Sequence, residues 1–111
     1  MDSGITIKPY SHPVTVRFHD VVIASTERAL ELLEPGHNPV LYIPFDDIYF
    51  VHLEKTDTST KCPWKGTASY WRVRGQGESS RDAMWAYEEP IPDVAAIQGH
   101  GAFDPKKVTF E

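Results

Sequence analysis

The sequence predicts a mainly β domain with one or two short helices. Nine prolines and seven glycines in 111 residues place turn signals at close, nearly regular intervals, which favours short strands over long helices. Between these turns, several short segments alternate apolar and polar residues, the period of a half-buried strand. An apolar fraction of 41% and a charged fraction of 24% are typical of one ordinary globular domain. Many short strands joined by turns therefore indicate an all-β fold.

The first half of the chain is expected to supply an arm and three strands. Two prolines exclude a helix from residues 1–13, which are predicted to form an extended arm before a single domain of residues 14–111. The strands expected in this half are residues 14–18, 21–24 and 40–43. His19 and Asp20 are expected to form a two-residue hairpin turn, and residues 34–39 a second turn.

Two segments of this half suggest helical structure. Ser25-Thr26-Glu27, at the start of the segment of residues 26–33, resembles a helix N-cap, and the segment carries apolar residues at helical spacing. The same residues also fit a bent strand, so the pattern leaves helix and strand equally open. Pro44, followed by two aspartates, predicts a brief helix that ends near Leu53.

The second half of the chain is expected to complete the sheet. Residues 57–60 are predicted to form a loop, and residues 75–82 a flexible turn. Residues 95–97 fit one helical turn. The strands expected in this half are residues 67–73, 84–88, 102–103 and 108–110.

Charge and cysteine content exclude several classes of partner. The formal net charge is −5 and no cluster of Lys and Arg is present, so a nucleic-acid partner is not expected. No apolar run reaches about 18 residues, and the first residues lack the pattern of a signal peptide, so no membrane partner is expected. A single cysteine forms no internal disulfide, which favours the cytoplasm.

The segment from Cys62 to Trp71 concentrates the residue types that build sites. It combines the only cysteine, Lys65, Tyr70 and two of the three tryptophans. A turn containing Pro63 and Gly66 leads directly into an alternating strand. Reactive and aromatic groups at the junction of a loop and a rigid strand are a common way to build a site.

Several short motifs together resemble a known family. The residues that carry the resemblance are Ala24-Ser-Thr26, Arg28-Ala29, Glu34, Pro39-Val-Leu-Tyr42, Pro44, Asp47-Ile48, Thr60, Cys62-Pro-Trp-Lys-Gly66, Ala68, Tyr70-Trp71, Trp85-Ala-Tyr-Glu88, Pro90, Gly99-His100 and Ala102-Phe103. Over residues 12–110 the chain is similar to the domain of unknown function 427 family. The resemblance implies a β-tent-like fold, in which two small antiparallel sheets meet at an angle. It implies no known activity, although the family is sometimes labelled nucleotidyltransferase-like.

The sequence does not predict a metal or a cofactor. Many β-tents hold a zinc ion with four cysteines, and this chain has one. The five histidines include no pair at ligand spacing. Nucleotidyl transfer needs carboxylates that converge on metal ions, but Asp46 and Asp47 are adjacent and point in different directions on a helix or a strand. No glycine loop of the phosphate-binding kind is present.

Aromatic residues give the strongest positive signal for a binding site. On a strand, Trp85 and Tyr87 share one side, and Tyr70 lies on the opposite side from Trp71. Aromatic side chains with polar tips suit a small apolar or cationic ligand. The predicted ligand-binding set is Tyr42, Tyr70, Trp85 and Tyr87, with Arg28, Lys65 and Glu88 at the rim.

The leading interpretation is a small cytoplasmic domain that binds an unidentified small molecule in this aromatic pocket. Simple core packing explains the same aromatics without a ligand. An alternative is an enzyme that uses the pocket with a reactive Cys62 or Lys65, although catalysis is not favoured. A further alternative is a structural or interaction module that forms a homo-oligomer through an exposed strand edge.

Overall fold

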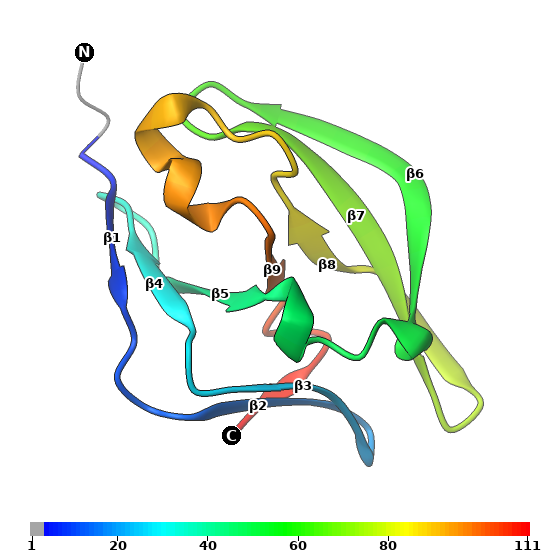
Figure 1. Cartoon of the computed structure of the whole chain (residues 1–111). Helices are drawn as coiled ribbons and strands as arrows, with labels where there is room; N and C mark the ends of the chain where they lie inside the picture. Colours follow the sequence, from blue (N-terminus) through cyan, green and yellow to red (C-terminus); the bar gives the residue numbers. More distant parts are fainter. Residues whose placement is uncertain (1–3) are drawn as a thin grey trace.

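The computed structural model describes residues 4–111 and consists of two antiparallel sheets with short 3₁₀ helices (Figure 1). The large sheet has the strand order β1-β4-β5-β9-β8-β7-β6, and the small sheet has the order β10-β2-β3. This architecture confirms the predicted all-β fold with two antiparallel sheets. The strands are β1 (Thr6–Pro9), β2 (Val14–Phe18), β3 (Val21–Thr26), β4 (Leu30–Leu33), β5 (Val40–Pro44), β6 (Leu53–Cys62), β7 (Gly66–Gly75), β8 (Glu78–Ala86), β9 (His100–Phe103) and β10 (Thr109–Phe110).

The β2–β3 hairpin follows the predicted alternation. Val14, Val16 and Phe18 are buried, while the residues between them are half-buried. The turn at His19 and Asp20 is also confirmed, with His19 in the left-handed region at a φ of 55°. The apolar face of this hairpin packs on the large sheet and forms the main core. Its buried members include Val14, Val16, Phe18, Ile23, Ile43, Trp71, Val73, Met84 and Phe103.

Residues 26–33 are extended and contain no helix. β3 continues through Thr26, and β4 pairs with β1 on one side and with β5 on the other. The sheet therefore takes the backbone hydrogen bonds that a helix would have made within the segment. β1 lies within the predicted N-terminal arm, of which residues 1–3 are outside the described part of the chain.

The predicted loop at residues 57–60 and the predicted turn at residues 75–82 are wrong in extent. Residues 57–60 belong to β6, and only Gln76 and Gly77 separate β7 from β8. The polar residues remain in the strands because side chains satisfy one another across the sheet. Asp82, in the left-handed region, accepts hydrogen bonds from Thr56 and Thr58 where the pairing of β6 with β7 is irregular.

Among residues 4–111, three short 3₁₀ helices lie in the two other segments that were predicted to be helical. Two of them, η1 (Phe45–Asp47) and η2 (Phe50–His52), occupy the region where one brief helix was expected. The third, η3 (Pro92–Ile97), includes the predicted helical turn at residues 95–97. Val94 and Ile97 of η3 are buried in a second core, on the other side of the large sheet from the main core.

Strand β6 forms one edge of the large sheet and curves outward with β7 (Figure 1). Exposed Lys55 and Lys61 lie along this edge. Charged side chains of this kind disfavour pairing with a second sheet edge. The edge therefore offers no particular support for the homo-oligomer alternative.

Candidate functional site

A row of side chains crosses four strands of the large sheet and forms the floor of the candidate site. Tyr70 of β7 is the register partner of Trp85 of β8, and Trp85 is the partner of Ala102 of β9. Continuing the β5–β9 register by one residue places Tyr42 opposite Ala102. Because Ala102 is small and buried, the larger side chains of Tyr42 and Trp85 can meet above it. The second core contains all of these residues together with Tyr87.

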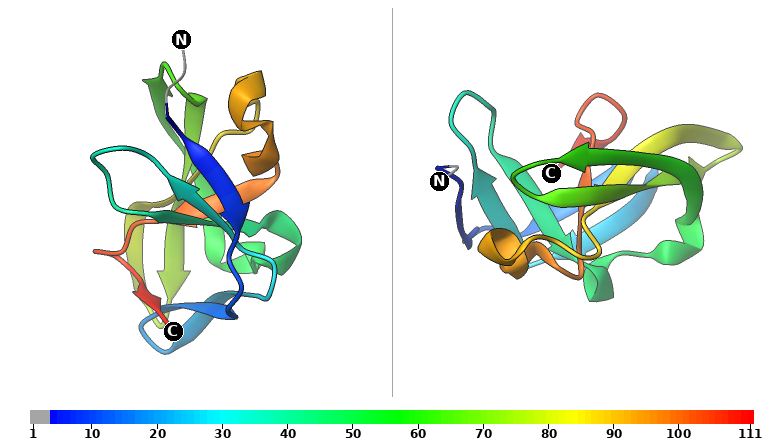
Figure 2. Two further views of the ribbon diagram at one scale, coloured as in Figure 1. Left: turned by 90° about the vertical axis from the view of Figure 1, so that its left-hand side faces the viewer. Right: turned by 90° about the horizontal axis from the view of Figure 1, so that it is seen from above.

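The floor lies in an open cavity of about 760 Å³. The loop between β4 and β5 and the loop between β9 and β10 project on the same side of the molecule, as both views in Figure 2 show. Residues from both loops line the cavity. The full lining is Leu32, Glu34, His37, Asn38, Val40, Tyr42, Cys62, Pro63, Trp64, Lys65, Tyr70, Asp82, Trp85, Tyr87, Asp104 and Lys107.

The four aromatic residues of the predicted ligand-binding set thus lie together on this cavity. Strand alternation accounts for their common side, because Tyr70 and Trp71 point to opposite faces. Trp71 packs in the main core, with its ring 6.2 Å from that of Phe45 in an edge-to-face arrangement. Trp64 also lines the cavity and is 39% exposed.

Lys65 lies at the cavity wall and is paired with Glu34. The Lys65 ammonium is 2.8 Å from a Glu34 carboxylate oxygen. The turn that holds Lys65 ends at Gly66, whose φ of +120° is poorly accessible to residues with a side chain. The backbone N–H of Ile91 donates a hydrogen bond to the Lys65 carbonyl and fixes the turn from the other side.

The hydroxyls of Tyr42 and Tyr87 remain protonated at neutral pH. Burial raises the pKa of Tyr42 to about 12, although a hydrogen bond from Trp85 opposes the shift. Burial also raises the pKa of Tyr87, with further contributions from Tyr42, Cys62, Tyr70 and Glu34. The Tyr70 hydroxyl is 2.8 Å from that of Thr60, close enough for a hydrogen bond.

Two of the predicted rim residues lie elsewhere. Arg28 forms an ion pair with Asp47, outside the cavity lining. Glu88 accepts hydrogen bonds from Lys55 and Ser69. Neither residue lies in a strand, and neither belongs to the cavity lining, where the aromatic cluster is found. Lys65 is the one member of the predicted rim set that lines the cavity.

Sequence reasoning missed most of the polar lining. Asp82 was assigned to a flexible turn, and Asp104 and Lys107 belong to a connection without a motif. The sequence pointed to Glu34 only through its place in the family resemblance and its position beside a proline turn. Cys62 is partly exposed and lines the cavity, next to the turn that carries Lys65.

A comparison with protein family models identifies the family of this chain. Residues 6–111 match the family model described as a domain of unknown function, DUF427, and labelled NTP_transf_9. The chain belongs to the DUF427 family. The match begins within β1 and reaches the end of the chain, so it includes part of the predicted arm. Among curated proteins, no relative is found.

The label of the DUF427 family names nucleotide transfer, which makes the arrangement of carboxylates relevant. Within residues 4–111, no three side chains of His, Cys, Asp or Glu come together in a group suited to a metal ion. Asp47 accepts hydrogen bonds from Thr26 and Arg28, which lower the pKa of its carboxyl despite partial burial. The adjacent Asp46 and Asp47 thus give no support to the nucleotide-transfer label of the family.

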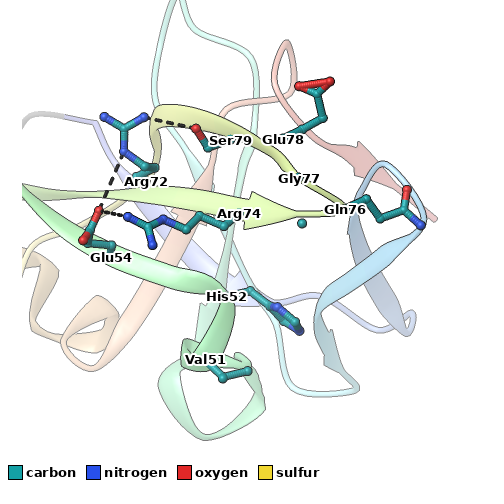
Figure 3. Close-up of a pocket in the computed structure, with 10 residues that line it drawn as sticks. Val51, His52, Glu54, Arg72, Arg74, Gln76, Gly77, Glu78 and Ser79 are labelled. Carbon is teal, nitrogen blue, oxygen red and sulfur yellow. Dashed lines mark hydrogen bonds and ion pairs between the residues drawn. The ribbon is translucent and has the colours of Figure 1, made fainter.

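A second groove lies near the β7–β8 turn (Figure 3). Arg72 and Arg74 line it, as does His52. Glu54 forms ion pairs with both arginines, at 3.8 Å to Arg72 and 2.6 Å to Arg74. The shared carboxylate neutralises much of the positive charge that an anion would require, and the groove lining contains no Phe, Tyr or Trp.

The helices of the described residues are single short 3₁₀ segments, none with the length and apolar character needed to cross a membrane.

Proposed function

We propose that the domain binds a small molecule in the cavity lined by Tyr42, Tyr70, Trp85 and Tyr87. The observation that carries this proposal is the convergence of these four side chains, from β5, β7, β8 and the residue after β8, on one open cavity. Small-molecule sites are typically concave and lined by aromatic groups, with a few polar groups that fix orientation.

The balance between packing and exposure supports a binding role. Tyr42 and Tyr87 are 1% and 7% exposed and hold the floor in place, whereas Tyr70 and Trp85 are only half-buried. The partly exposed Trp64 adds an apolar surface at the mouth. Rings with one supported face and one open face offer stacking area without a large cost in conformational entropy.

A thermal-shift screen against a metabolite library, followed by calorimetry, tests the proposal. A ligand that binds only the folded state raises the melting temperature by mass action. Trp85→Ala and Tyr70→Phe are expected to weaken binding of any ligand found, while the stability of each variant is followed by urea unfolding. The control is Tyr49→Phe, at an exposed tyrosine outside the cavity. Unchanged affinity in both cavity variants places the site elsewhere and contradicts the proposal.

A further inference from the structure

The Tyr87 side chain is mostly buried, but its hydroxyl has no hydrogen-bond partner among the described residues. Its side chain is only 7% exposed. Among the described residues, the structure contains no hydrogen bond to this hydroxyl, and yet no fully enclosed side-chain oxygen or nitrogen is left unsatisfied. The hydroxyl therefore reaches open space, and the open space next to it is the cavity that Tyr87 lines. An unpaired donor of this kind is costly unless water or a ligand satisfies it.

Tyr42 places a second donor in the same cavity. Its hydroxyl takes part in a hydrogen bond with Trp85. The indole N–H only donates, so the Tyr42 oxygen is the acceptor and its own proton remains available. Burial raises the pKa of both tyrosines above the ordinary value, so both hydroxyls keep their protons across the neutral range and can donate them. The two hydroxyl groups line the same cavity and interact electrostatically, so together they suit one acceptor oxygen.

The charges around the cavity disfavour an ionised partner for these donors. The lining contains three carboxylates, from Glu34, Asp82 and Asp104, and two ammonium groups, from Lys65 and Lys107. Within this described lining, each ammonium already has a partner. Lys65 pairs with Glu34, and Lys107 donates to the Arg81 carbonyl and lies 4.0 Å from Asp104. An anionic ligand would meet a net negative lining without a free cation.

A cationic ligand is also disfavoured, because the carboxylates that could pair with it already have partners in the protein. Glu34 is held by Lys65, and Asp82 accepts hydrogen bonds from Thr56 and Thr58. An ammonium has no acceptor lone pair, so it would leave the hydroxyl protons of Tyr42 and Tyr87 unpaired. What remains is an uncharged acceptor attached to a flat apolar body.

We propose that the cavity takes an uncharged ring compound whose carbonyl oxygen, of the amide or ketone class, accepts hydrogen bonds from Tyr42 and Tyr87. The ring then lies against Trp85 and Tyr70. This assignment rests on the proposed binding function and names the chemistry of its ligand.

Four probes that share one benzene ring test the assignment. They are benzamide with a neutral carbonyl, benzoate with a carboxylate, benzylamine with an ammonium and toluene with a methyl group. Binding to the full chain is measured by protein-observed NMR titration at neutral pH, with resonances of the cavity residues as the readout. Benzamide is expected to bind more tightly than the other three, with the largest shift changes at Tyr87 and Trp85.

Variants separate the hydrogen bonds from the ring contacts. Tyr87→Phe removes the donor and is expected to weaken benzamide binding by about fivefold to tenfold, the size of one net hydrogen bond. Toluene binding should be unchanged in the same variant. Tyr42→Phe is expected to act in the same direction, and Tyr49→Phe is the control without effect. NMR spectra of each variant establish that it is folded.

Each outcome tests either the carbonyl assignment or the proposed binding function on which it rests. A preference for benzoate or benzylamine in the cavity, or benzamide binding insensitive to Tyr87→Phe, overturns the carbonyl assignment and leaves the proposed binding function standing. Equal binding of toluene and benzamide also overturns the carbonyl assignment and leaves the proposed binding function standing. If no probe, even at millimolar concentration, perturbs the cavity resonances while the metabolite screen also yields no ligand, both proposals fail.

Discussion

Lys65 and Glu34 form an ion pair with their charged groups 2.8 Å apart, and their side chains are only 13% and 17% exposed. The pair ties the turn between β6 and β7 to the residue that follows β4, 31 positions earlier in the chain. A pair of this kind holds two walls of the cavity at a fixed separation. Its removal should affect both stability and the site.

Removing one partner of this pair is expected to be destabilising. Lys65→Met keeps the apolar stem but leaves Glu34 partly buried without its cation, which should lower the free energy of unfolding by about 1–3 kcal/mol. Urea unfolding at neutral pH measures the change. The matched control is Lys55→Met, because the Lys55–Glu88 pair has a similar separation of 2.7 Å with side chains 52% and 43% exposed.

The control should lose about 0.2–1 kcal/mol, as is usual for exposed pairs. The double variant Lys65→Met/Glu34→Gln should recover part of the loss, because it removes the uncompensated charge. Equal losses at Lys65 and Lys55 contradict the importance of burial for the first pair.

The second prediction concerns Asp82 and acid. Partial burial opposes ionisation of this carboxyl, but hydrogen bonds from Thr56 and Thr58, with Arg81 and Lys107 nearby, lower its pKa below the ordinary value. A lowered pKa in the folded state contributes stability above the unfolded value of about 3.9. That contribution is lost as pH falls through the folded pKa, so stability should decrease on acidification.

Asp82→Asn isolates this contribution, because asparagine tolerates the φ of 56° found at this position. The variant should lose about 1–2 kcal/mol of unfolding free energy at neutral pH. It should also show a weaker loss of stability in acid. The control is Asp57→Asn on β6, where the aspartate side chain is 94% exposed. A stability curve for Asp82→Asn that parallels the wild type at every pH would refute the prediction.

The third prediction concerns the free energy of unfolding at neutral and alkaline pH and compares two tyrosines. Burial raises the pKa of Tyr42 to about 12, whereas the ordinary pKa of a tyrosine in an unfolded chain is about 10. A raised folded pKa contributes stability below the unfolded value and loses it as pH rises through the folded pKa. Unfolding free energy should therefore decline between about pH 10 and about pH 12.

Tyr42→Phe should reduce this alkaline decline and lose about 1 kcal/mol near neutral pH, because Trp85 loses its acceptor. Tyr87→Phe should leave neutral stability almost unchanged, since its hydroxyl has no partner to lose among the described residues. Guanidinium unfolding across this pH range measures both effects. A substantial loss of neutral stability in Tyr87→Phe would show that the hydroxyl has a protein partner, against the structure.

The fourth prediction concerns the turn that carries Lys65. Gly66→Ala introduces a Cβ only 3.3 Å from the Glu89 carbonyl oxygen at a φ of +120°. Strain and contact together should cost about 2–4 kcal/mol. Gly77→Ala is the control, because Gly77 also has a positive φ but nothing lies within 4 Å of the added Cβ. The control should lose about 1 kcal/mol. Similar melting temperatures for the two variants contradict a tight approach at Gly66.

The sequence by itself determined the strands with clear alternation and the side on which each aromatic lies. In β2, alternation predicts burial residue by residue, and the parity of Tyr70 against Trp71 follows from the pleat alone. It did not determine residues 57–60, because strings of Thr, Ser and Asp resemble a loop until Asp82 supplies acceptors from the next hairpin. The same applies to residues 26–33, where sheet partners decided between strand and helix.

Only the tertiary structure decided the composition of the site. Tyr42, Trp85 and Tyr70 form a row because strand order inserts small Ala102 between the first two, and strand order is a long-range property. Glu34 meets Lys65, while Arg28 meets Asp47 and Glu88 meets Lys55, each through contacts that local patterns do not encode. Side-chain direction is local and follows from backbone geometry, whereas the partner of a charge depends on which distant segments the fold brings within a few ångströms.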